Sequence, residues 1–261
     1  MRKTSFVLKR AIPGALAVDA VSSRSFARHT HDEYGIGVVR SGAQRSSSGR
    51  GPCEAGAGDV ITVNPGEVHD GEPIGDSRAW TMLYLSPAMV GAIVADIRDG
   101  RSRDMEFTDP VVRAPGAARR FLTAYNALIS GDGDAATERL IRLVAGLVGT
   151  EAPRATAPRS LMHLRSRIDD DPSGAHPLDV LARQAGISQF QTLRGFARLT
   201  GLTPHAYVVQ RRLDLARSLI RRGTGLAEAA MAAGFADQSH FHRAFTRRHG
   251  FTPGAYARAV N

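Results

Sequence analysis

The sequence predicts an α+β protein of two domains, an N-terminal domain of strands with a helical hairpin and a C-terminal domain of helices alone. Short apolar runs separated by turn residues fill the chain to about residue 85, helical periodicity follows, and the last 80 residues contain an internal repeat. The 261 residues suffice for two domains of roughly 100–150 residues each. With 43% apolar and 23% charged residues, and no apolar run near the ~20 residues of a membrane span, the composition excludes a disordered chain and an integral membrane protein.

The N-terminal elements are predicted in chain order from their apolar patterns. Four strand-like runs alternate with Gly, Pro, Ser and Asp clusters at a spacing typical of a β-sandwich or barrel. Helical periodicity then predicts a short helix and two longer ones, and the Gly-Asp sequence between the longer helices predicts a tight turn and an antiparallel hairpin. The predicted strands cover 16–21, 35–39, 60–63 and 80–85, and the predicted helices cover 88–98, 116–129 and 135–148. These elements define a first domain over 1–150, and Pro153 and Pro158 predict a linker over 151–159.

Positive charge is concentrated in the C-terminal part of the chain. Residues 172–261 hold twelve arginines against four acidic residues, so they carry +8 of the net charge of +9. A general bias toward arginine would raise this residue everywhere and would not make the net charge uneven. A polyanionic partner is therefore favoured for this part. The single cysteine, Cys53, and the absence of a secretory signal pattern at the N-terminus predict a cytoplasmic protein.

The C-terminal part repeats itself at an offset of 48 and then 49 residues. The segment Leu178–Gly186 matches Leu226–Gly234, and Thr203-Pro204 matches Thr252-Pro253. In each copy a short Ala-rich helix ends at a glycine and a polar cap opens a second helix, which is the pattern of a helix-turn-helix. We expect the two motifs over about 178–199 and 226–249, joined by one helix over 204–222 that is about 28 Å long.

The second helix of each copy combines an apolar face with a face of Gln, Arg, His and Ser. Such polar groups hydrogen-bond the edges of DNA bases and phosphates, and a rigid spacer of this length suits two contacts about one DNA turn (~34 Å) apart. The alternative is a helical repeat that binds another protein, which would leave the exposed Gln and Arg and the +8 charge unexplained. Leu193, Phe196 and Ala197 are expected in the core of the first motif, and Phe241, Ala244 and Phe245 in that of the second.

The segment 178–257 resembles the DNA-binding domain of the AraC/XylS family of bacterial transcription regulators, most closely over Gly234–Tyr256 and Arg212–Arg217. The resemblance implies a DNA-binding domain over 160–261, with a first helix over 160–170. Thr192 stands where the family usually has an apolar residue, and we expect Leu193 to compensate by a small shift. The expected base contacts are Gln189, Phe190, Gln191, Arg194, Gln238, Ser239, His240, His242 and Arg243, of which Phe190 is equally a candidate for the core. The expected phosphate contacts are Arg211, Arg212, Arg247 and Arg248.

Two N-terminal motifs, His29–Tyr34 and Gly58–His69, together resemble the two halves of a cupin barrel, the usual sensor domain of this regulator family. His29 and His31 alternate and so project from one side of a strand, where imidazoles suit a transition metal. Glu33 lies closer to His31 than in metal-binding cupins. We therefore favour polar groups lining an effector cavity, with no cofactor; a metal site of His29, His31 and His69 is the alternative. The expected effector pocket consists of His29, His31, Tyr34, His69, Trp80 and Tyr84.

The predicted function is that of a sequence-specific transcription regulator, an activator by resemblance, and not an enzyme. A small effector in the N-terminal barrel would modulate DNA binding, and the helical hairpin would dimerise the chain. The expected partners are double-stranded DNA, the effector, a second copy of the chain and RNA polymerase, without a membrane. The alternative is a metal-dependent cupin enzyme with an appended nucleic-acid-binding domain.

Overall fold

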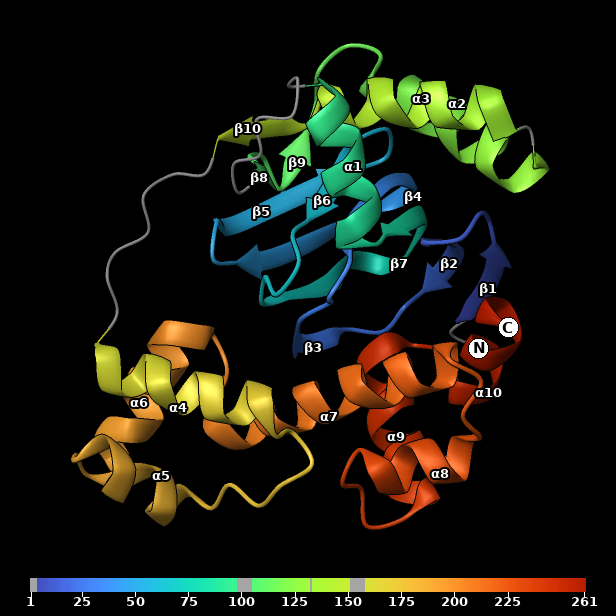
Figure 1. Ribbon diagram of the computed structural model, residues 1–261. Helices are drawn as coiled ribbons and strands as arrows, with labels where there is room; N and C mark the ends of the chain where they lie inside the picture. The colour runs from blue at the N-terminus through green and yellow to red at the C-terminus, as the bar shows by residue number, and fades with distance from the viewer. Residues whose placement is uncertain (1–3, 98–104, 132, 151–157) are drawn as a thin grey trace. The chain divides into compact units, whose positions relative to one another are not determined.

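The computed structural model describes residues 4–97, 105–131, 133–150 and 158–261, which form two compact units divided after Ala152 (Figure 1). Each unit is described by itself below. The predicted linker 151–159 lies outside the described residues except at its last two positions, where Pro158 precedes a helix. None of the helices in the described ranges is long and apolar enough to span a membrane.

The described residues of the first unit form one eight-stranded antiparallel sheet and a two-stranded sheet, and the four predicted strands lie in the larger one. The path through the large sheet is β1-β2-β7-β4-β6-β9, with β3 paired to β7 and β5 paired to β4. Its strands are β1 (Ser5–Arg10), β2 (Ala15–Ser22), β3 (Phe26–His29), β4 (Tyr34–Ser48), β5 (Gly51–Gly56), β6 (Val60–Val63), β7 (His69–Leu85) and β9 (Val111–Val112). Because β7 is long, its C-terminal half pairs with β2 and its N-terminal end pairs with β3.

Three helices, α1 (Pro87–Ile97), α2 (Ala117–Ser130) and α3 (Gly133–Ala145), pack on one face of this sheet (Figure 1). Alternate residues of the strands, such as Ile36, Leu83 and Leu85, share one hydrophobic core with helix residues such as Phe121 and Leu128. The opposite face of β7 carries Trp80, Met82 and Tyr84. We call it the helix-free face of the sheet.

The helical hairpin of α2 and α3 is confirmed, but its second helix is shorter than predicted. The helix predicted over 135–148 ends at Ala145, and Val148 begins strand β10 (Val148–Thr150), which pairs with β8 (Met105–Phe107). Val148 lies directly opposite Phe107 in this pairing. A tertiary partner more than 40 positions away decides the conformation here, and local periodicity does not report it.

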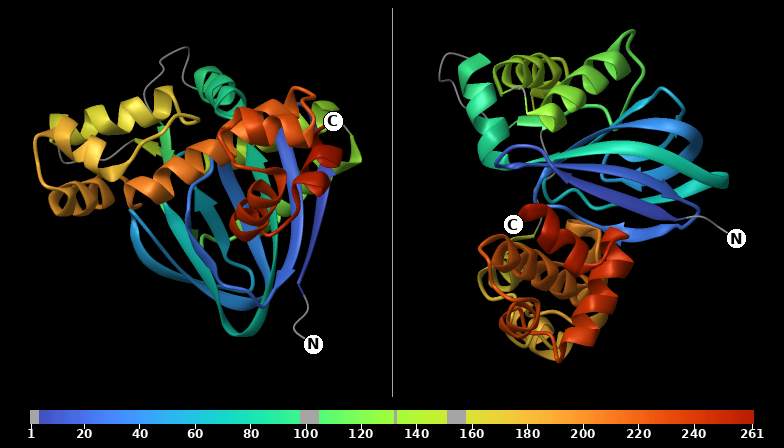
Figure 2. Two further views of the ribbon diagram at one scale, coloured as in Figure 1. Left: turned by 90° about the horizontal axis from the view of Figure 1, so that it is seen from below. Right: turned by 90° about the vertical axis from the view of Figure 1, so that its right-hand side faces the viewer.

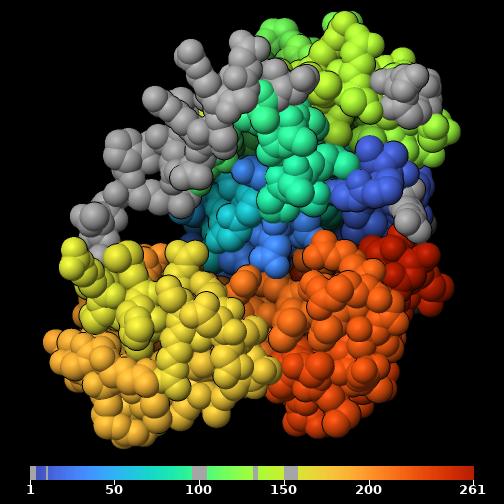
Figure 3. Space-filling model, in the orientation of Figure 1, coloured from blue at the N-terminus to red at the C-terminus, as the bar shows by residue number. Residues whose placement is uncertain are grey.

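In the second unit the regular elements of residues 158–261 are all helices, and they form two helix-turn-helix motifs joined by one long helix (Figure 2). Helix α4 (Arg159–Asp170) packs its buried residues Leu161, Leu164 and Ile168 against the first motif, as expected. The other helices are α5 (Leu178–Ala185), α6 (Gln189–Thr200), α7 (Pro204–Arg221), α8 (Leu226–Ala232), α9 (Gln238–His249) and α10 (Pro253–Val260). Figure 3 shows α4–α6 as one lobe of this unit, in yellow, and α8–α10 as another, in orange and red.

Candidate functional site

The first helix-turn-helix motif is built by α5 and α6. Helix α5 ends at Gly186, whose φ of 67° is a left-handed conformation that glycine adopts without steric cost. Ser188 then caps α6: its hydroxyl accepts a hydrogen bond from the Gln191 amide, and the Gln191 side chain accepts one from the Ser188 amide. This reciprocal capping box fixes the start of the helix that carries the predicted base contacts.

The second motif repeats this construction with α8 and α9. Gly234 has a φ of 80°, and the Asp237 carboxylate caps α9 by accepting a hydrogen bond from the His240 amide. Phe241 and Phe245 of α9 are fully buried, as their spacing predicts. The repeated pattern in the sequence therefore corresponds to two copies of one local structure.

The exposed side of α6 and α9 carries every residue that the sequence assigned to base contacts. All of these side chains are exposed: Gln189, Phe190, Gln191, Arg194, Gln238, Ser239, His240, His242 and Arg243. Several of them have additional contacts within the protein, among them His240, whose ring meets the Phe235 ring edge to face at 5.4 Å. Gln191 holds the helix cap, and the Arg194 guanidinium lies 5.4 Å from the centroid of the Phe190 ring. The two exposed faces together form a candidate nucleic-acid interface of hydrogen-bonding and cationic groups.

Phe190 and Thr192 have the opposite burial from the one that their polarity alone predicts, which is a buried phenylalanine and an exposed threonine. Phe190 is 66% exposed and does not enter the core, whereas Thr192 is fully buried. The Thr192 hydroxyl donates a 2.9 Å hydrogen bond to the carbonyl of Ser188, one turn earlier in the helix. Because this bond satisfies the hydroxyl, Thr192 packs in the position that the family gives to an apolar residue, and Leu193, which is only half-buried, does not replace it.

Three of the four arginines expected at phosphates have internal partners. The Arg212 guanidinium donates to the carbonyls of Pro172, Ser173, Gly174 and Gly234 at 2.7–3.3 Å. Its donors are therefore committed to the backbone, and we assign Arg212 to structure.

The other two arginines interact with carboxylates, Arg211 through ion pairs and Arg248 through the electrostatic attraction of Asp214. Arg211 lies 3.0 Å from Asp169 and 3.2 Å from the buried Asp214 in ion pairs. Burial lowers the pKa of Arg248, and the negative charge of the same Asp214 opposes this shift. We therefore withdraw Arg211 and Arg248 as phosphate contacts, and Arg247, which is exposed and has no ion pair among the described residues, keeps this role as a proposal.

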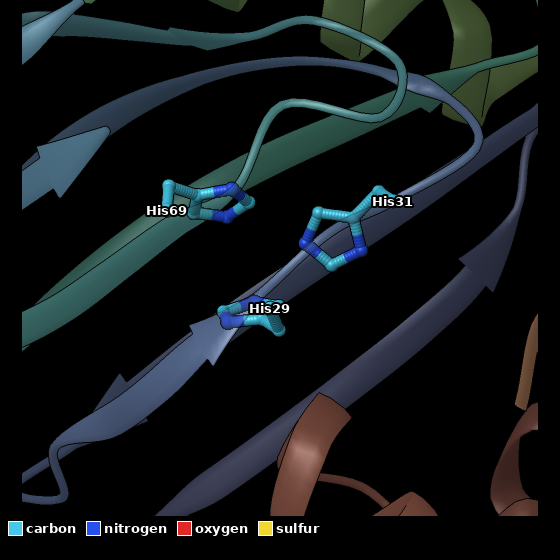
Figure 4. Close-up of side chains that lie close together, drawn as sticks. All are labelled: His29, His31 and His69. Carbon is cyan, nitrogen blue, oxygen red and sulfur yellow. The ribbon is translucent and has the colours of Figure 1, made fainter. Parts of the chain in front are cut away.

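In the first unit, the structure brings together the three predicted histidines on the helix-free face (Figure 4). His29 of β3 lies directly opposite His69 of β7, and His31 follows β3 in the loop. Their ring centroids are 4.4 Å apart for His29 and His69, 4.9 Å for His29 and His31, and 5.1 Å for His31 and His69. Burial lowers the pKa of His69, and the carbonyl and carboxylate of Glu67 oppose this shift.

Of the aromatic residues predicted for the pocket, Tyr84 contacts one of these histidines. The Tyr84 ring lies 5.1 Å from that of His31. Tyr34 instead donates a 2.8 Å hydrogen bond to the carbonyl of Met105 and packs on Phe107. Trp80 belongs to a different aromatic cluster on the sheet.

That second cluster contains residues that sequence reasoning missed. The rings of Phe6, Phe26 and Trp80 meet edge to face at 5.9–6.2 Å, and the Arg78 guanidinium lies 4.9 Å from the Trp80 centroid. Arg78 is only 3% exposed, and burial lowers its pKa to about 10. No local pattern identifies it, because an arginine beside Trp80 at a strand position ordinarily points to solvent.

Comparison with known proteins agrees with this division of the chain. The family model described as the AraC-like ligand binding domain matches residues 17–147, half of the chain, and a helix-turn-helix domain model matches residues 181–259. The chain belongs to the AraC family of transcriptional regulators. The regulator YbfI of Bacillus subtilis is 27% identical over 234 residues, which cover 83% of this chain and 82% of YbfI.

Other relatives of this AraC-family chain match over shorter stretches. MtrA of Neisseria gonorrhoeae is 32% identical over 99 residues, and LumQ of Photobacterium leiognathi is 42% identical over 77 residues. The matched segments span 33% of MtrA and 31% of LumQ. Among solved structures, an apo variant of ToxT from Vibrio cholerae has a TM-score of 0.57 at 11% identity and covers 97% of this chain and 100% of ToxT, which shows a shared two-domain fold.

Proposed function

We propose that this AraC-family chain is a sequence-specific transcription regulator whose binding to double-stranded DNA is modulated by a small effector. The duplicated helix-turn-helix carries the proposal, because α6 presents Gln and Arg side chains and α9 presents Gln, His and Arg side chains to solvent, in a segment (172–261) of net charge +8. Side chains of this kind read base edges in the major groove, while the positive charge supplies affinity for phosphates.

Helix α7 is the second support for a two-part DNA site. Its 18 residues make a rigid spacer about 27 Å long between the two motifs. Two recognition helices at such a separation contact adjacent major grooves on one side of a duplex, whose repeat is about 34 Å. The proposed operator therefore has two short sequence blocks about one helical turn apart for each chain.

The effector is proposed to bind on the helix-free face of the first unit, beside His31 and Tyr84. Imidazole and phenol groups in an otherwise apolar surface give a small molecule both burial and orientation. ToxT shares this fold and has been crystallised with an unsaturated fatty acid bound, at a TM-score of 0.56 and 12% identity. The bound effector would shift the population of chains that engage both blocks at once, and the chain is not an enzyme in this proposal.

The α2–α3 hairpin is proposed to dimerise the chain. Leu122 of α2 is a large apolar side chain that is 39% exposed, and Ala118 and Ile129 of the same helix are partly buried against the core. A second copy packed on this helix would link two DNA-binding units and raise the effective concentration of the second at the operator. We also propose that the DNA-bound chain activates transcription through RNA polymerase, in the cytoplasm.

Sequencing of genomic fragments retained by the purified full chain at two salt concentrations tests the proposal. We expect a recurrent site with two blocks about one turn apart, retained at the higher salt, because base contacts depend less on salt than phosphate contacts do. If the fragments share no sequence motif and are no longer retained at the higher salt, the domain binds DNA only as a non-specific basic surface.

A further inference from the structure

The three imidazoles on the helix-free face are positioned as a set of ligands. One ring nitrogen from each of His29, His31 and His69 can be chosen so that all three lie within 4.8 Å of one another. His29 and His31 are 7% and 6% exposed, so these rings are withdrawn from water. Figure 4 shows the rings of all three turned toward a common point from β3, the following loop and β7.

Backbone carbonyls fix the tautomer of two of these rings. The Nδ1 atom of His29 lies 2.8 Å from the carbonyl of Ala27, and the Nδ1 atom of His69 lies 3.0 Å from the carbonyl of Glu67. A carbonyl oxygen only accepts hydrogen bonds, so each Nδ1 carries the proton and the lone pair lies on Nε2. A histidine that ligates a metal is usually oriented by such a hydrogen bond from its other ring nitrogen.

The spacing of the nitrogens is close to that of a metal site. Nitrogens bound tetrahedrally at about 2.0–2.1 Å are roughly 3.4 Å apart, so side-chain rotations that bring the nitrogens closer by at most about 1.4 Å complete a site. One divalent cation can be bound by the Nε2 atoms of His29 and His69 together with one ring nitrogen of His31.

We propose that His29, His31 and His69 bind one divalent transition-metal ion of the kind that prefers imidazole, such as Zn²⁺. Three protein ligands leave a fourth tetrahedral position, which water or a donor atom of an exogenous small molecule would occupy. The proposed metal site lies beside the proposed effector surface. Metal binding there does not depend on DNA binding, so a failure to bind metal would leave the proposed regulator function unchanged.

The experiment uses the untagged full chain after removal of metal by a chelator. Zn²⁺ or Co²⁺ is added, unbound metal is removed, and retained metal is quantified by mass spectrometry. We expect one equivalent per chain, with an intense visible Co²⁺ spectrum characteristic of four-coordinate nitrogen ligation. His29→Gln, His31→Gln and His69→Gln should each lower the affinity by more than about 100-fold, beyond the usual effect of losing an outer-shell partner.

The matched control is His163→Gln, which changes an exposed histidine of α4 and should retain one equivalent of metal. If a variant of the cluster does not fold, the Co²⁺ spectrum of the unchanged chain decides the question, because octahedral adventitious Co²⁺ absorbs only weakly. No stoichiometric metal, or equal metal in the control and in all three folded variants, would overturn the proposal.

Discussion

The guanidinium of Arg212 donates a 2.7 Å hydrogen bond to the carbonyl of Gly234, at the turn of the second helix-turn-helix motif. The same side chain also reaches the carbonyls of residues 172–174, between α4 and α5. One arginine of α7 thus joins the segment that leads into the first motif to the turn of the second.

Replacing Arg212 should therefore affect stability, whereas replacing Arg247 should affect DNA binding. We expect Arg212→Met to lower the free energy of unfolding by about 1–3 kcal/mol, because partly buried carbonyls lose their donors. Arg247→Met should change stability by less than about 0.5 kcal/mol and reduce the salt dependence of DNA affinity by about one phosphate contact. Urea unfolding and DNA titrations at several salt concentrations measure both. An equal loss of salt dependence in the two variants would return Arg212 to the phosphate contacts.

Gly234 should tolerate substitution less well than its counterpart Gly186. Both have positive φ, so alanine at either position costs about 1 kcal/mol of backbone strain. A Cβ at Gly234 would also lie 2.6 Å from the carbonyl oxygen of Ser173, whereas a Cβ at Gly186 meets nothing within 4 Å. We expect Gly234→Ala to destabilise by a further ~1–3 kcal/mol in urea unfolding. Equal losses in the two variants would show that the loop moves away freely.

Arg243 is expected to read one base pair. It is exposed on α9 and has no ion pair among the described residues, so its guanidinium is available to a guanine edge. Arg243→Ala should cost about 1–3 kcal/mol at one operator position and relax the preference there. Competition binding with single-base operator variants measures this. Arg258→Ala, an exposed arginine of α10, is the control and should leave the preference unchanged. Uniform weakening on all sequences would make Arg243 a phosphate contact.

Asp19 predicts a pH dependence of stability in the first unit. Burial raises the pKa of its carboxyl, but hydrogen bonds from Thr81, Lys9 and Tyr125 outweigh this and hold the pKa below its ordinary value. A depressed folded-state pKa contributes stability above the unfolded-state value near 3.8, and this contribution is lost as the pH falls through the folded-state pKa.

Asp19→Asn isolates that contribution. We expect the variant to be less stable than the parent by about 1–3 kcal/mol at pH 7, and the difference to shrink as the pH falls below 4. Urea unfolding at pH 7, 5 and 3 measures the difference. A constant difference at all pH values would mean that the carboxylate charge contributes nothing and that shape alone matters.

Local patterns predicted β2, β6, parts of β4 and β7, the hairpin and both helix-turn-helix motifs, because caps, turn glycines and apolar spacing act within a few residues of each other. They did not predict β1, β3, β5, β8, β9 or β10, whose pairing partners lie elsewhere in the chain. The direction of long charged side chains was not predictable in the same way. Arg212 and Arg247 are the same residue type on neighbouring helices, and only the folded chain places carbonyls around the first. Thr192 shows a further limit, since a hydroxyl that bonds to its own helix is as easily buried as an apolar group.

Arg78 gives the last prediction, because it is a buried cation without an ion pair among the described residues. Its Nη1 atom lies 3.4 Å from the carbonyl of Arg24, and its buried Nε atom has no hydrogen-bond partner. Contact with the Trp80 and Phe26 rings offsets part of the cost of removing the charge from water.

Methionine has a similar reach and no charge, so Arg78→Met should raise the free energy of unfolding, toward the lower end of the about 1–4 kcal/mol seen when buried charges are replaced by apolar groups. Arg113→Met, at a 63% exposed side chain, is the control and should change stability by less than about 0.5 kcal/mol. Thermal and urea unfolding of the full chain measure both variants. A loss of stability in Arg78→Met would instead show that the aromatic contacts outweigh desolvation and that the cation contributes to the fold of the sheet.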